Sequence, residues 1–300
     1  MFNHQAFRLT DHLVRQVATT SMSYTKFKST DLNPEFTLDP KYKYSEAIDI
    51  YAEAMQLLKN KKEHLSQHEM CEYVFEYIQR QSKRITDQDA YYRRCEKKNQ
   101  ESLHAYLTQL LNHYARLLFV RVDFSIQKKY QHEVDLEQFQ DYLKIMSNRY
   151  SNQDGCFSDL QGHAWAIEEG LDKGLHCHTL LIYDGNKRQN DAYLGGLIQD
   201  YWSQLTKNKG YCFISNMRAY KQQFEEQGTL GIGMIHRDHK QEVQNALNTA
   251  QYLVNPEKEL QHLRVRLPRM RTFGTGQFEI KKRRGLDKPR HLNNHAILRQ

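Results

Sequence analysis

The 300-residue chain has few cysteines, few prolines and no long apolar run. Its five cysteines are odd in number and form no Cys-x-x-Cys pair, which argues against a disulfide framework or zinc ribbon and favours a reducing compartment. No segment approaches the roughly 20 apolar residues that a membrane-spanning helix needs. The first residues lack the basic and apolar regions of a signal peptide. We therefore expect a cytoplasmic protein with no membrane contact.

Prolines are absent between Pro40 and Pro256, so this long interval contains no obligatory break in a helix or strand. After an irregular beginning over residues 1–43, apolar residues recur at helical spacing up to about residue 113, and beyond it they alternate. We expect a helical N-terminal region, a mixed domain and a basic tail, over residues 1–104, 105–275 and 276–300.

The mixed domain has strand patterns and helix patterns in turn. The expected strands lie at residues 117–126, 157–169, 175–184, 211–217 and 231–235. The expected helices begin near residues 135, 194 and 239. Because a short loop joins the second and third strands, they form an antiparallel hairpin. The sequence thus predicts an α+β fold, with helices on one face of a central antiparallel sheet and the other face available to a ligand.

The positive charge is concentrated near the C-terminus. From Arg264 to Arg290 there are ten Lys or Arg against two acidic residues, while the rest of the chain is close to neutral. This asymmetry favours contact with a polyanion such as nucleic acid, although a solvated tail has the same composition. The candidate DNA-binding residues are Arg264, Arg266, Arg269, Arg271, Lys281, Lys282, Arg283 and Arg284.

Two histidines one residue apart are the main candidates for chemistry. A strand would project His176 and His178 from one face, about 7 Å apart. The hairpin would bring Glu168 onto the neighbouring strand as a third ligand. Such a set suits Mn²⁺, Zn²⁺, Co²⁺ or Fe²⁺, whereas Mg²⁺ would bind through the carboxylate, waters and a substrate phosphate. The alternative is a pair of hydrogen-bonded histidines that hold no ion.

Three further residues have a possible role beside this set. Arg121 and Asp123 project from the same face of the first expected strand, where they either support the ligands and steer a substrate or form a structural ion pair. Tyr252 lies about 200° around the last expected helix from the apolar Ala250, so its hydroxyl faces the polar side. Position alone does not separate Tyr252 from the other tyrosines of the chain.

Three groups of segments, taken in order, resemble one protein family. They are residues 114–124; residues 165–170, 174–178 and 183–185; and residues 231–235, 250–253 and 271–274. Over about residues 105–275 the chain resembles the inovirus gene-2-like proteins, also called the YagK/YfjJ C-terminal family. These are phage- and prophage-associated relatives of the HUH rolling-circle replication initiators.

The resemblance implies an HUH endonuclease, RRM-like core and a reaction on DNA. By the family's motifs, Glu168, His176 and His178 hold Mg²⁺ or Mn²⁺, and Tyr252 is the nucleophile. The family nicks single-stranded DNA at an origin, which is often a hairpin, and leaves a 5′-phosphotyrosine and a free 3′-OH. That end primes rolling-circle replication of a phage, prophage or plasmid, with a host helicase or polymerase as a possible partner.

One departure from the family pattern keeps a second function open. A lysine usually follows the tyrosine by three residues, but this chain has Asn255 there, and Lys258 is the nearest substitute. A non-catalytic DNA-binding protein for replication or regulation is therefore an alternative. A two-histidine phosphoesterase is a weaker one, because the half-signature that begins at His178 has no second copy. The metallo-β-lactamase pattern is absent, since Thr179 and Leu180 follow the histidines.

Overall fold

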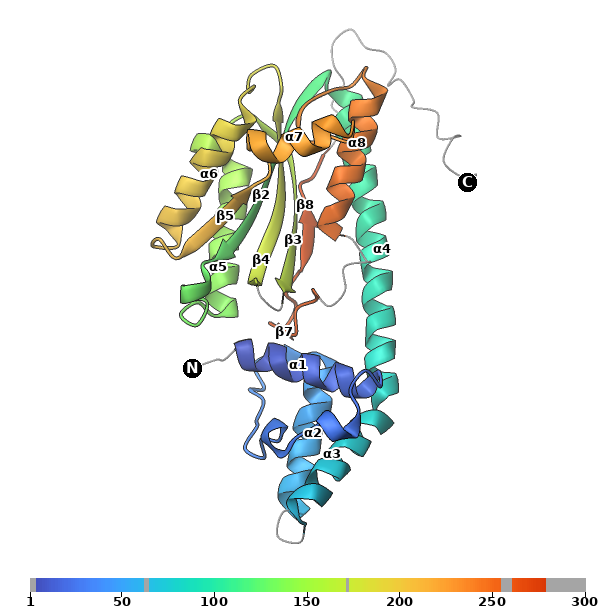
Figure 1. Cartoon of the computed structure of the whole chain (residues 1–300). Helices are drawn as coiled ribbons and strands as arrows, with labels where there is room; N and C mark the ends of the chain where they lie inside the picture. Colours follow the sequence, from blue (N-terminus) through green and yellow to red (C-terminus); the bar gives the residue numbers. More distant parts are fainter. Residues whose placement is uncertain (1–3, 62–64, 171–172, 255–260, 279–300) are drawn as a thin grey trace, which may run out of the picture.

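The structure is a computed structural model that describes residues 4–61, 65–170, 173–254 and 261–278 (Figure 1). The predicted α+β class is confirmed. The described helices are α1 (His4–Ala18), α2 (Glu46–Lys61), α3 (Gln67–Arg80), α4 (Ser82–His113), α5 (Leu136–Asn152), α6 (Asp191–Leu205), α7 (Arg218–Glu226) and α8 (Lys240–Gln251). Within these residues no helix has the length and apolar character required to cross a bilayer.

The strands form one large and one small antiparallel sheet. They are β1 (Lys43–Tyr44), β2 (Arg116–Ile126), β3 (Leu160–Gly170), β4 (Gly174–Asp184), β5 (Gly210–Ile214), β6 (Gly233–His236), β7 (Val265–Arg266) and β8 (Phe273–Thr275). The large sheet has the order β5-β2-β4-β3-β8, and β6 pairs with the part of β2 that β5 leaves uncovered. The small sheet pairs β1 with β7. The predicted β3–β4 hairpin and antiparallel centre are confirmed.

Helices cover both faces of the sheet, which corrects the expectation of helices on one face only. On one face, Trp202 of α6 packs against Phe124 of β2, and Phe139 of α5 packs against Trp202. On the other face, α4 and α8 share a core with Leu117 and Phe119. The reason lies in β2, because its first residues are apolar on both faces of the sheet. Each face of this part of the strand must therefore be covered by helices. On the face covered by α4 and α8, only the later half of β2 carries polar side chains.

The N-terminal region is a helical bundle that α4 joins to the sheet. The core of the bundle holds Val14 and Val17 of α1 with apolar residues of α2 and α3. The irregular beginning expected over residues 1–43 is wrong for α1, because Val14 and Val17 form a helical stripe that is buried in this core. Helix α4 is continuous from the bundle to the sheet (Figure 1), so the sequence-based boundary at residue 104 lies inside it.

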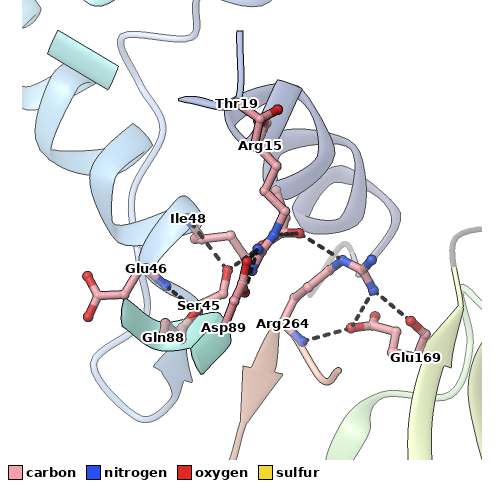
Figure 2. A network of polar contacts seen from close by, with 10 residues as sticks. Arg15, Thr19, Ser45, Glu46, Ile48, Gln88, Asp89, Glu169 and Arg264 are labelled. Atoms are coloured by element: carbon pink, nitrogen blue, oxygen red, sulfur yellow. Dashed lines mark hydrogen bonds and ion pairs between the residues drawn. The ribbon is translucent and has the colours of Figure 1, made fainter. Parts of the chain in front are cut away.

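A buried polar network ties the bundle to the end of the sheet (Figure 2). Arg264, just before β7, donates from Nη1 to the Glu169 carbonyl at 2.6 Å, and its Nε lies 3.3 Å from Asp11 Oδ2. Arg15 of α1 contacts Asp11 at 2.9 Å and Asp89 of α4 at 2.8 Å. The network therefore links α1, α4, β3 and the segment that leads into β7.

This network corrects the expectation that Arg264 contacts DNA. The Arg264 side chain is only 4% exposed, and its guanidinium is enclosed by the partners described above. A phosphate cannot reach it without breaking the contact between the bundle and the sheet. Arg264 is therefore a structural residue at the start of the basic segment.

Replacing Arg264 should destabilise the protein strongly. Arg264→Ala removes a buried guanidinium from Asp11 and Glu169, and loss of one partner of a buried ion pair costs about 3 to 5 kcal/mol. Urea unfolding at pH 7 measures the loss. Arg271→Ala is the control, since this exposed arginine lies in the same segment and should change stability by about 0.5 kcal/mol or less. A loss below about 1 kcal/mol for Arg264→Ala would show that the network does not hold the two regions together.

Candidate functional site

Strand register brings the predicted ligands together on one face of the sheet. Glu168 of β3 is directly opposite His176 of β4. His178 is opposite Asp123 of β2. Because side chains alternate along a strand, these four project to the same side. Both histidines are buried, and their ring centroids are 4.9 Å apart.

Three ligand atoms converge at this point. Glu168 Oε2 lies 3.2 Å from His178 Nε2 and 3.6 Å from His176 Nε2. His176 Nδ1 lies 3.0 Å from the Gly174 carbonyl oxygen, which can only accept, so Nδ1 carries the proton and Nε2 presents a lone pair. The Nε2 atoms of both imidazoles thus face the Glu168 carboxylate. Such a set of electron donors is suited to a divalent cation.

Asp123 lies behind this centre and orients His178. Its Oδ1 is 2.9 Å from His178 Nδ1, on the side of the ring away from Glu168. Burial lowers the pKa of His178, but hydrogen bonds and charges from Asp123 and Glu168 outweigh it and raise the pKa above its usual value. Burial likewise raises the pKa of Asp123, but His178 and Arg121 hold it below its usual value. The site therefore favours positive charge between its carboxylates.

Arg121 lies close to Asp123 and His178, but its contact with Asp123 is long. Its Nε lies 3.8 Å from Asp123 Oδ1, a longer separation than that between Asp123 and His178. Asp123 was expected either to support the metal ligands or to form an ion pair with Arg121. Its shorter contact with His178 favours the first role. Arg121 lines the open space in front of the histidines and gives it a positive charge.

A groove of about 790 Å³ extends from the histidines across β2 to β5, and we call it the aromatic groove. The cross-strand rows run from His176 to Tyr211 and from His178 to Phe213. Tyr211 and Phe213 are 54% and 38% exposed, unusually high for aromatic side chains on a sheet. Tyr220 of α7 packs edge-on against Phe213 and also lines the groove.

The sequence reading missed these aromatic residues as site residues. Their signal was the Tyr211-x-Phe213 alternation, which places both rings on one face of a strand. Lys128 and Lys173 also line the groove and give it basic side chains outside the C-terminal segment.

A second hollow of about 410 Å³ lies on the other side of Glu168, and we call it the α4 pocket. Tyr91 and Tyr92 of α4 line it together with Arg266 and Arg271. The Arg266 guanidinium lies 4.8 Å from the centre of the Tyr92 ring. Gln261 lines both the α4 pocket and the aromatic groove. The predicted ligands therefore lie between two adjoining hollows.

Of the remaining arginines of the basic segment, Arg266 lines the α4 pocket, Arg269 lines a hollow beside α5, and Arg271 lines both. Arg269 and Arg271 are exposed. Arg269 lines a hollow beside α5 with Cys177 and Thr179, which face away from the histidines. Several predicted site residues lie outside the described part of the chain: Lys258, Lys281, Lys282, Arg283 and Arg284, together with Asn255.

Tyr252 lies where α8 ends and a 3₁₀ turn, η6 (Tyr252–Val254), begins. This helix was expected to run to residue 254, but its last turn tightens. The Tyr252 side chain is 57% exposed, while Leu253 and Val254 are buried. Val254 lines the α4 pocket together with Glu168. The turn that carries Tyr252 is thus anchored beside the strand that carries Glu168.

The family model of the YagK/YfjJ C-terminal domain matches residues 80–276, which include α4 and the whole large sheet. No curated protein and no solved structure matches the chain significantly.

Replacing Asp123 should weaken metal binding without removing a predicted ligand. Asp123→Asn keeps the shape of the side chain but loses the charge that orients His178, and loss of such an outer partner typically costs 10- to 100-fold in affinity. Titration calorimetry with Mn²⁺ at pH 7.5 measures the change. Asp141→Asn, an exposed carboxylate on α5, is the control and should bind like the wild type. Equal affinity in all three proteins would show that Asp123 does not support the centre.

Proposed function

The chain belongs to the YagK/YfjJ C-terminal domain family, and on this premise we propose that it is an HUH-type replication initiator. In this proposal it is a metal-dependent endonuclease and strand transferase that nicks single-stranded DNA at an origin. The free 3′-OH primes rolling-circle replication of a phage, prophage or plasmid. The observation that carries the proposal is the set of converging donors at the end of an aromatic, basic groove.

The donor set supports a phosphodiester as the substrate. Held by Glu168, His176 and His178, Mg²⁺ or Mn²⁺ would supply the positive charge that neutralises a scissile phosphate and holds it in place. Arg121 adds a fixed positive charge at the same groove. Asp123 keeps the His178 ring oriented with Nε2 toward Glu168.

Tyr252 is the proposed nucleophile. Its phenolic oxygen forms a bond to phosphorus, the bond from phosphorus to the 3′ oxygen breaks, and a 5′-phosphotyrosine and a free 3′-OH result. The phenol loses its proton to solvent, and the departing 3′ oxygen gains one. The covalent link keeps the phosphodiester available for later transfer. The exposed ring and the anchored η6 turn leave this hydroxyl accessible to a strand.

The groove and the pocket support binding of an unpaired strand. Bases stack on exposed aromatic rings irrespective of sequence, and basic side chains follow the backbone. Tyr211 and Phe213 provide the rings, with Lys128 and Lys173 nearby. A strand that lies in the aromatic groove can continue past Gln261 into the α4 pocket, so that its phosphate passes the ligands.

One observation favours a second candidate function. Asn255 stands where the family usually has a lysine, so a charge that assists the nucleophile is missing from that position. A DNA-binding protein that recognises an origin or regulates transcription without cutting would keep the groove and tolerate this loss.

A covalent capture assay distinguishes the two functions. The wild-type protein with Mn²⁺ should form a protein–DNA adduct with a pool of labelled single-stranded hairpin oligonucleotides of randomised sequence, seen as a shifted band on a denaturing gel. EDTA and Tyr252→Phe should each abolish the adduct, because one removes the cation and the other the nucleophile. Tyr193→Phe is the control, since this tyrosine is 62% exposed and lies on α6.

Three other results of the capture assay would contradict the proposal. An adduct that persists in Tyr252→Phe would exclude Tyr252 as the nucleophile. Retained DNA binding without any adduct would favour the non-catalytic function. Cleaved products without an adduct would indicate a phosphoesterase that uses water.

The aromatic groove can be tested without catalysis. Tyr211→Ala and Phe213→Ala should each weaken binding of a single-stranded oligonucleotide by about 5- to 150-fold, because one stacked base contributes about 1 to 3 kcal/mol. Fluorescence anisotropy in EDTA at fixed salt measures the affinity. Tyr193→Ala, on α6, serves as the matched control. Unchanged affinity in both groove variants would place the strand elsewhere.

A further inference from the structure

A second group of metal-binding side chains lies outside the proposed active site. His236 ends β6, His239 precedes α8, and Glu242 is in the first turn of α8. Glu242 Oε2 lies 2.9 Å from His236 Nδ1, and Glu242 Oε1 lies 2.8 Å from His239 Nδ1. The imidazole centroids are 5.2 Å apart. One ligand atom from each residue lies within 4.8 Å of the others.

The backbone holds this group in place. The His236 amide donates to Glu242 Oε2 at 2.7 Å, so the carboxylate is fixed to the end of β6. The His239 amide donates to the His236 carbonyl at 3.0 Å and closes the turn between strand and helix. Zinc ligands lie about 2 Å from the ion, so three donors that already lie within 4.8 Å of one another are close to the spacing that one ion requires.

The chemistry of the donors selects the kind of ion. Two imidazole nitrogens and one carboxylate suit a borderline transition ion, whereas Mg²⁺ would find only the Glu242 carboxylate here, without the substrate phosphate that completes its ligands at the proposed active site. The side chains of His236, His239 and Glu242 are 42%, 64% and 35% exposed, so an ion can enter from solvent and keep a water as its fourth ligand. We propose that His236, His239 and Glu242 form a second site, which binds Zn²⁺ or a similar transition-metal ion.

This site is separate from the proposed active site and does not depend on the proposed function. It lies at the beginning of α8, and Tyr252 follows the end of the same helix. Twelve residues of helix place the two about 18 Å apart. An ion here would cross-link β6 to α8 and stabilise the turn between them.

Zinc titration of the purified full-length chain tests the proposal. Titration calorimetry with Zn²⁺ at pH 7.5 should show one bound ion fewer for His239→Ala than for the wild type. The His178→Ala variant should retain this ion, and the double variant should lose it. Asp238→Ala is the matched control, because this carboxylate lies in the same turn, is 78% exposed and is not part of the group.

A second measurement separates binding here from binding elsewhere. In the His178→Ala background, Zn²⁺ should raise the melting temperature, and adding His239→Ala should abolish the rise. Circular dichroism checks that each variant is folded. If His239→Ala binds as many zinc ions as the wild type, with affinity changed less than tenfold, the proposal is wrong. If the wild type binds one ion and His239→Ala none, the second site stands and zinc binding by Glu168, His176 and His178 fails.

Discussion

Antiparallel pairing of β2, β4 and β3 is the constraint on which the proposed site depends. It places Glu168 beside His176, and His178 between Ala166 and Asp123. A slip of one residue in either pairing would turn the affected side chains to the face that α5 and α6 cover. The register is fixed because that face buries a mostly apolar core, which includes Val122, Phe124 and Leu181, so a slip would expose these residues to water. Burial on one face therefore determines which polar groups meet on the other.

The second face is divided between core and site along the length of β2. Leu117 and Phe119 lie under α4 and α8, whereas Arg121, Asp123 and Ser125 continue the same face without helical cover. The apolar half closes a core behind the ligands, and the polar half leaves them accessible to a substrate. The histidines are buried although they line a groove, and this arrangement strengthens electrostatic interactions with anything that binds there.

The arginines of the basic segment have two kinds of surroundings. Arg264 is enclosed by Asp11 and Glu169, and through them it connects the helical bundle to the sheet. Arg266 and Arg271, a few residues later, line the α4 pocket beside Glu168. The bundle is thereby coupled to the candidate site, since α4 supplies Tyr91 and Tyr92 to the same pocket. A residue's charge alone did not distinguish these positions, because burial decides whether a guanidinium is enclosed by carboxylates or stays open to a pocket.

The sequence alone determined the features that depend on neighbouring residues. The alternation in β2, the start of a helix near residue 135 and the His-x-His spacing each depend on a few neighbouring residues, and the structure has the expected elements there. Only the tertiary structure decided which elements pack together: the helices on the ligand face, the burial of Arg264, and the aromatic edge of β5. It also brought His236, His239 and Glu242 within contact distance. These features depend on contacts between segments far apart in the chain or across a turn, which periodicity along the sequence does not encode.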